Sequence, residues 1–93
     1  MEDLPTRRAA LAAVDLDGRG VVLEFTISRK LYRCPGCGDG VAVGAEHVLV
    51  KIAPPGERPF HQHWHRACTV ALRRELRQER AVPPGTPAVP PRA

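Results

Sequence analysis

The chain has 93 residues, with 14 basic and 10 acidic side chains and a formal net charge of +4. This length allows one small domain, and ten prolines shorten the part of it that can pack. No apolar run approaches the roughly 18 to 20 residues needed to span a bilayer, no charged-then-apolar segment opens the chain, and three cysteines cannot all pair within it. The composition therefore argues against a membrane protein and a disulfide-rich secreted protein, and we expect a cytoplasmic protein.

Residues 1–20 are predicted to form an N-terminal arm that contains one short helix. Their alanines and leucine favour a helix, with Pro5 or Thr6 near its start. The glycines of residues 17–20 end it. We expect this arm either to dock on the domain or to fray.

Residues 21–27 are dense in β-branched and aromatic side chains. Leu23, Phe25 and Ile27 alternate onto one face, which is typical of a strand. The chain then continues through residues 28–33 toward the first cysteine pair. The domain is thus predicted to begin with a strand that leads into that pair.

Two pairs of metal-ligand side chains follow. Cys34 and Cys37 lie three apart on a glycine-rich turn, where Gly38 permits the positive φ that such a knuckle needs. After 27 intervening residues come His65 and Cys68, also three apart. Each pair can hold one side of a tetrahedral ion, the second from the first turn of a helix. The spacing predicts one structural Zn²⁺ bound by these three cysteines and His65.

The histidines and the first cysteine pair also allow other interpretations. His61, His63 and His65 alternate, so in an extended strand His61 or His63 could compete as the fourth ligand. We favour His65 because residues three apart on a helix share one face, which brings it beside Cys68. His47 is expected to be an exposed strand residue. A redox dithiol would need a helix from the first cysteine, which the neighbouring glycines disfavour.

The spacer between the ligand pairs predicts a β-hairpin. Residues 41–43 and 47–53 alternate well enough for one strand, residues 54–57 form a turn, and residues 58–64 return.

A C-terminal helix is predicted to begin at the last two ligands and to end before Pro83. Cys68, Leu72 and Leu76 repeat at helical spacing. Residues 83–93 are rich in proline, and we expect a disordered, partly polyproline tail that does not pack.

The order of strand, knuckle, hairpin and helix resembles the treble-clef zinc fold. The predicted fold class is therefore small α+β, with an arm (1–20), a zinc-stabilised treble-clef domain (21–82) and a tail (83–93). Within that group, Cys-x-x-Cys followed by a strand and then Trp64-His65-x-x-Cys68 looks most like the zinc fingers of poly(ADP-ribose) polymerases, and more loosely like half of a LIM domain. Both resemblances imply the same four ligands.

The whole chain also resembles small actinobacterial proteins described as ATP/GTP-binding. The phosphate-binding motif Gly-x-x-x-x-Gly-Lys-Ser/Thr is absent, so the residues do not support a nucleotide site of that kind.

The basic excess points to an anionic partner. Residues 29–80 hold ten basic and five acidic side chains, and arginine suits bidentate phosphate contacts. Glu75 and Glu79 lie three or four residues from arginines, so a solvated helix face explains the pattern equally well. A face that binds DNA or RNA and a protein-protein adaptor are thus the two alternatives. The candidate nucleic-acid-binding residues are Arg29, Lys30, Arg33, Arg66, Arg73, Arg74 and Arg77.

Catalysis has little support in the sequence. Four protein ligands leave zinc no open position, and no Ser-His-Asp or paired-carboxylate arrangement is apparent. We therefore expect a non-enzymatic module with no evident small-molecule substrate.

Overall fold

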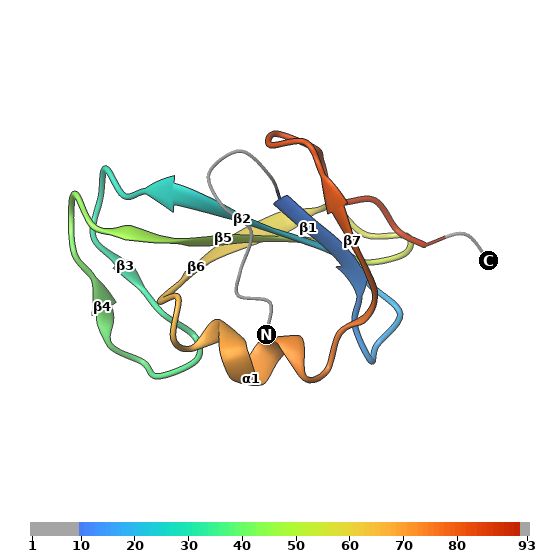
Figure 1. Cartoon of the computed structure of the whole chain (residues 1–93), viewed down its shortest axis with the longest axis horizontal. Helices are drawn as coiled ribbons and strands as arrows, with labels where there is room; N and C mark the ends of the chain where they lie inside the picture. The colour runs from blue at the N-terminus through green and yellow to red at the C-terminus, as the bar shows by residue number, and fades with distance from the viewer. Residues whose placement is uncertain (1–9, 92–93) are drawn as a thin grey trace.

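The computed structural model describes residues 10–91, which are mostly β (Figure 1). A five-stranded antiparallel sheet has the order β6-β5-β2-β1-β7, and β3 and β4 form a separate hairpin. None of the described helices is long and apolar enough to cross a membrane. The elements are β1 (Ala10–Val14), β2 (Gly20–Ile27), β3 (Tyr32–Arg33), β4 (Gly40–Val41), β5 (Glu46–Ala53), β6 (Phe60–Trp64), α1 (Thr69–Arg73) and β7 (Arg77–Val82).

The centre of the sheet agrees with the sequence analysis. The strand predicted over residues 21–27 is confirmed as β2, which pairs along its whole length with β5. The predicted hairpin is also confirmed, since β5 pairs antiparallel with β6 from Val48 opposite Trp64 to Ile52 opposite Phe60. This hairpin delivers the chain to His65.

The short N-terminal helix is wrong for the described part of the arm. Residues 10–14 form β1, which lies between β2 and β7, while residues 1–9 lie outside the described residues. Leu11 and Ala13 pack on one face of the sheet and Ala10 and Ala12 on the other. Because both faces of β1 are covered, tertiary packing overrides the helical preference of its alanines.

The long C-terminal helix is also wrong. The helix α1 contains only five residues, and the chain then turns into β7, which pairs with β1. Leu72 and Leu76 still pack against the core, as their spacing predicted. The pairing of β7 gives hydrogen-bond partners to the backbone of β1, which would otherwise form an unpaired edge.

Two apolar clusters lie on opposite faces of the sheet. The larger contains Leu23, Val48 and Val50, and it is covered by Trp64 and Leu72 on the side where α1 lies. The smaller cluster is built mainly from alanines of β1 and from Val22 and Ala53. The fold class is therefore mostly β rather than the predicted α+β.

The proline-rich segment of residues 83–91, here called the strap, packs on the second face. It contains no helix or strand, but its Ala88 is only 8% exposed and joins the alanine cluster. The expectation that this segment does not pack is thus wrong for the residues described.

Polar contacts and one close approach hold the strap against the sheet. Lys51 Nζ pairs with Glu24 at 2.6 Å and donates to the carbonyl oxygen of Thr86 at 3.1 Å. At Gly20 an added Cβ would lie 1.7 Å from the carbonyl oxygen of Val89. The strap can cross β2 at this point only because Gly20 has no side chain.

Candidate metal centre

The β3–β4 hairpin carries the first two ligands. Cys34 donates its backbone N–H to the carbonyl oxygen of Asp39 at 2.9 Å and accepts the N–H of Gly38 at its own carbonyl at 2.8 Å. Gly38 has φ of 79°, a conformation that side chains rarely adopt. The knuckle predicted for Cys34 and Cys37 is therefore formed.

The other two ligands lie between β6 and α1. The N–H of Cys68 donates to the carbonyl oxygen of His65 at 3.0 Å, which closes a turn just before the helix. Cys68 is the N-cap residue of α1. The pair therefore precedes the helix instead of occupying its first turn, but the turn still points both side chains toward the knuckle.

The structure brings all four predicted ligands together. Their ligand atoms lie within 4.8 Å of one another. The Nδ1 atom of His65 is 3.3 Å from Cys37 Sγ and 3.9 Å from Cys68 Sγ. Since zinc bonds of about 2.3 Å to sulfur and about 2.0 Å to nitrogen separate tetrahedral ligands by about 3.5–3.8 Å, the group fits a zinc ion.

Hydrogen bonds orient the ligands from behind. The Nε2 atom of His65 lies 2.9 Å from the carbonyl oxygen of Gly40. A carbonyl can only accept, so Nε2 carries the proton and Nδ1 presents its lone pair to the site. The backbone N–H of His65 also donates to Cys34 Sγ at 3.3 Å.

The sulfur atoms influence one another's protonation. Burial raises the pKa of the Cys34 thiol, but hydrogen bonds from the backbone N–H groups of His65, Cys37 and Gly36 outweigh this and lower the pKa to about 7. For Cys68, burial followed by the neighbouring Cys34 and Cys37 raises the pKa to about 12. A cation at the centre would remove the repulsion among the thiolates.

Trp64 and Gly36 connect the knuckle to the core. The contact between Gly36 and the Trp64 ring was not predicted from the sequence. A Cβ on Gly36 would lie 2.7 Å from Cζ3 of Trp64 and 2.9 Å from Cβ of Cys68. Trp64 packs against the larger apolar cluster, and its Nε1 donates to Gln62 at 3.0 Å. The absence of a side chain at position 36 lets the knuckle lie against the indole ring.

His61 and His63 lie outside the ligand group. His63 stacks on Tyr32 with ring centroids 3.5 Å apart, and its Nδ1 contacts Nε2 of His47. Burial, followed by the nearby His47 and His61, lowers the pKa of His63. His47 was expected to be exposed, but it is 0% exposed because this ring cluster encloses it.

Three of the candidate nucleic-acid-binding residues lie near the knuckle. Arg29 and Lys30 are exposed in the turn between β2 and β3. Arg33 is exposed on β3, and its Nη1 donates to the carbonyl oxygen of Gly38 at 2.6 Å.

The other candidates are distributed along α1, the loop before it and β7. Arg66 lies 5.3 Å from the ring centroid of Phe25. Arg73 pairs with Glu79 at 3.0 Å. In Figure 1 the β2–β3 turn and β7 lie on opposite sides of the molecule. The remaining two candidates, Arg74 and Arg77, are exposed. The seven predicted residues thus come from separated elements.

No family model, curated protein or solved structure matches this chain. The interpretation of the site therefore depends on its own geometry.

Proposed function

We propose that Cys34, Cys37, His65 and Cys68 hold one structural Zn²⁺. The observation that carries this proposal is the convergence of their four ligand atoms within 4.8 Å. Three thiolates and one imidazole form a soft donor set that suits zinc in closed, tetrahedral sites. The ion would tie the β3–β4 hairpin to the end of β6 and the start of α1.

The arrangement around the site also supports the treble-clef resemblance. A knuckle on one hairpin (β3–β4) is followed by a second hairpin (β5–β6), and then by the last two ligands just before a helix. In this proposal α1 is a shortened form of the helix that closes such a fold, and β1, β2 and β7 extend it into a larger sheet.

We further propose a non-enzymatic role. Four protein ligands complete a tetrahedral shell, which leaves no position for a substrate or an activated water. Zinc would act here on folding and on the placement of loops, and the function would be binding.

Nucleic acid is the first candidate ligand. Arg29, Lys30 and Arg33 are exposed on the segment that leads into the knuckle, so zinc would hold this segment in place. Arginine and lysine neutralise phosphates, and binding of this kind weakens as salt rises because counterions are released.

A gel-shift series at rising salt tests this candidate with zinc-loaded protein on duplex DNA, single-stranded DNA and RNA. We expect the triple variant Arg29→Gln, Lys30→Gln, Arg33→Gln to lose the shift, and the double variant Arg74→Gln, Arg77→Gln to retain more of it. If the unaltered protein gives no shift at low salt, the nucleic-acid candidate is eliminated.

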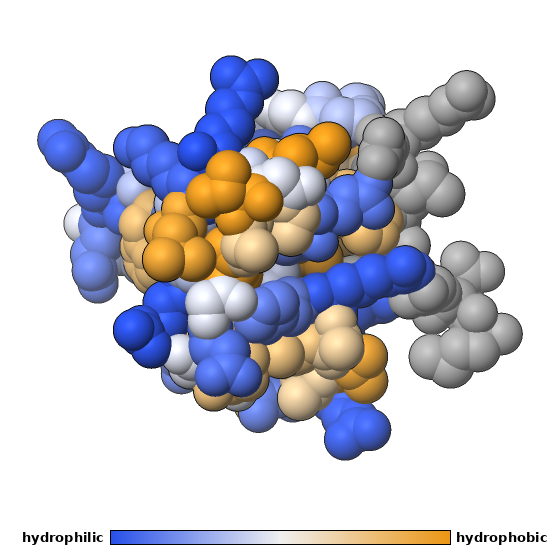
Figure 2. Space-filling view, turned by 90° about the vertical axis from the view of Figure 1, so that its left-hand side faces the viewer, coloured by the Kyte–Doolittle hydropathy of each residue, from blue (hydrophilic) through white to orange (hydrophobic). Residues whose placement is uncertain are grey.

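A protein partner is the second candidate, and an exposed apolar patch favours it. Ile27, Leu31 and Val43 are 51%, 73% and 66% exposed. Figure 2 shows apolar side chains gathered, with hydrophilic ones around them, on the end of the molecule that carries β3 and β4. Backbone hydrogen bonds join Ser28, in the turn after β2, to Gly44 and Ala45, in the turn before β5. Leu31→Ser should weaken such a complex and leave zinc content unchanged.

A further inference from the structure

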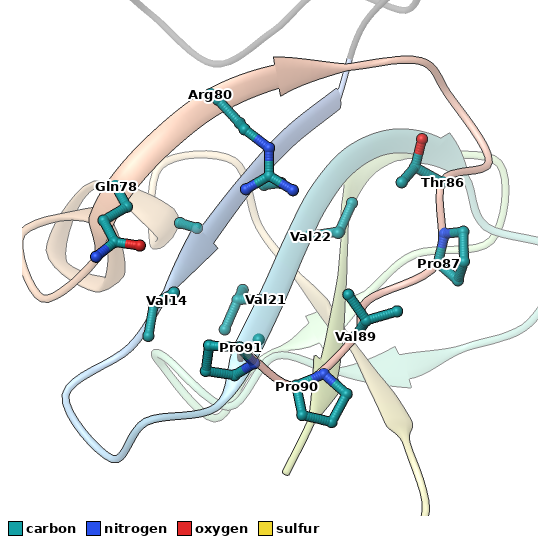
Figure 3. Close-up of a pocket in the computed structure, with 13 residues that line it drawn as sticks. Val14, Val21, Val22, Gln78, Arg80, Thr86, Pro87, Val89, Pro90 and Pro91 are labelled. Carbon is teal, nitrogen blue, oxygen red and sulfur yellow. The ribbon is translucent and has the colours of Figure 1, made fainter. Parts of the chain in front are cut away.

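A groove lies on the face of the sheet that carries the strap, away from the metal centre. It has a volume of about 600 Å³ and lies between β7, β1 and β2 on one side and the strap on the other (Figure 3). None of the four candidate zinc ligands lines it. Its volume is within the roughly 300–1,000 Å³ that small-molecule sites occupy.

The floor and one wall of the groove are apolar. Ala12 and Val22 pair across β1 and β2 and form part of the floor. Val89, Pro90 and Pro91 of the strap form the wall, which Figure 3 shows running past Val22 and Val21. These surfaces can take up the hydrocarbon part of a ligand.

Arg80 is the one charged side chain among the described residues that line this groove. It lies opposite Ala12 in the register of β7 and β1, and Figure 3 shows it extending across β1 toward Val22. Within residues 10–91 no hydrogen bond or ion pair is recorded for Arg80. By contrast, Arg73 on the opposite face is paired with Glu79. The groove therefore combines apolar surface with one guanidinium that has no ion-pair partner among residues 10–91.

A β-bulge sets the position of this charge. The register of β7 against β1 shifts between Ala12 and Val14, and Gln78 at the shift has φ of 58°. Bulges and positive φ at residues other than glycine are often found beside binding sites, where they redirect side chains. Here Gln78 and Arg80 both line the groove, while Glu79 between them faces Arg73.

We propose that this groove binds a small organic monocarboxylate with a compact hydrocarbon body. The carboxylate pairs with the Arg80 guanidinium, a match in charge and in planar geometry. The hydrocarbon body packs mainly against Val89 of the strap, which is 58% exposed, above the buried floor of Ala12 and Val22. Because the strap closes one side, the groove suits a compact ligand better than a long polymer.

The test uses zinc-loaded full-length protein with 3-phenylpropanoate and its neutral analogue 3-phenylpropanamide. Titration calorimetry gives the affinities, and methyl NMR spectra locate the ligand. We expect saturable binding of the acid, at least about tenfold tighter than the amide, with shifts at the methyl groups of Ala12, Val22 and Val89.

Two single variants then test whether Arg80 is the residue that binds the carboxylate. Arg80→Gln should weaken binding of the acid about tenfold and leave the amide unchanged, while Arg77→Gln, on the same strand but outside the groove, should leave both unchanged. Both positions are exposed, so unchanged zinc content and thermal transition are the expected controls. Absence of saturable binding at millimolar acid, equal binding of acid and amide, or an equal loss in Arg77→Gln would overturn the proposal.

Discussion

The β3–β4 hairpin and the five-stranded sheet differ in how much apolar surface stabilises each of them. The β3–β4 hairpin has strands of two residues each, and Cys34 and Val41 are its buried apolar residues. The sheet beside it buries two clusters of side chains over strands of five to eight residues. A short hairpin cannot persist on so little burial, so the proposed zinc ion would stabilise the knuckle, whereas apolar packing stabilises the sheet. The comparison shows that apolar burial is unevenly distributed in this small chain, with little in the β3–β4 hairpin and two clusters on the sheet.

Loss of a zinc ligand should have the largest effect, and it should be confined to one end. We expect Cys68→Ala to weaken zinc binding by at least about 100-fold, because the four-ligand site loses one thiolate bond. Native mass spectrometry measures the stoichiometry, and hydrogen exchange should show loss of protection in the β3–β4 hairpin before the sheet.

His61→Ala is the matched control for the ligand variant. His61 lies outside the ligand group, so its removal should leave zinc content intact. A Cys68→Ala protein that kept both its zinc and its thermal transition would contradict the assignment, and the reverse ranking of the two variants would move the site.

Removal of a core side chain should affect the sheet instead. Leu23 is fully buried in the larger cluster, so Leu23→Ala should lower the free energy of unfolding by about 2–5 kcal/mol through lost burial and a residual cavity. Denaturant unfolding of zinc-loaded protein measures this value, with exposed Leu16→Ala as the control. An equal loss in both variants would place the core elsewhere.

Zinc affinity should rise with pH, because zinc binds thiolates and not protonated thiols. The pKa of Cys68 is raised to about 12 in the metal-free protein, so this thiol is protonated at neutral pH and must release its proton to zinc. Each released proton changes affinity about tenfold per pH unit. Because the pKa of Cys34 is lowered to about 7, the slope should steepen as pH falls below 7. Competition with a chelator across pH 6–9 measures it, and a flat profile would argue against thiolate ligands.

Gly20→Ala should have the smallest effect on the whole molecule and a clear local one. Its Cβ would overlap the carbonyl oxygen of Val89, so the strap must move away from β2. We expect faster proteolysis within residues 83–91 and a loss of about 1 kcal/mol in unfolding free energy, within the usual range for single substitutions. Zinc content should not change. Unaltered proteolysis would show that the strap is not held at this point.

The candidate metal ligands could be predicted because their arrangement is local in the chain. Cys34 with Cys37, and His65 with Cys68, are each three apart, and a short turn is enough to aim each pair. The strands around Leu23 and Val50 could be predicted in the same way, since the alternation of apolar residues is visible within a single strand. Neither inference needed to know which distant segments meet.

The secondary structure of residues 10–14 and of the segment around Leu72 and Leu76 depends on contacts with distant segments. Residues 10–14 read as a helix because alanine favours one locally, yet they became a central strand because β2, β7 and the strap cover them from three directions. Leu72 and Leu76 keep helical spacing although the chain stops being helical after Arg73. In both places the local pattern fits two structures. The choice between them was made by the backbone hydrogen bonds and the burial that only the assembled sheet provides.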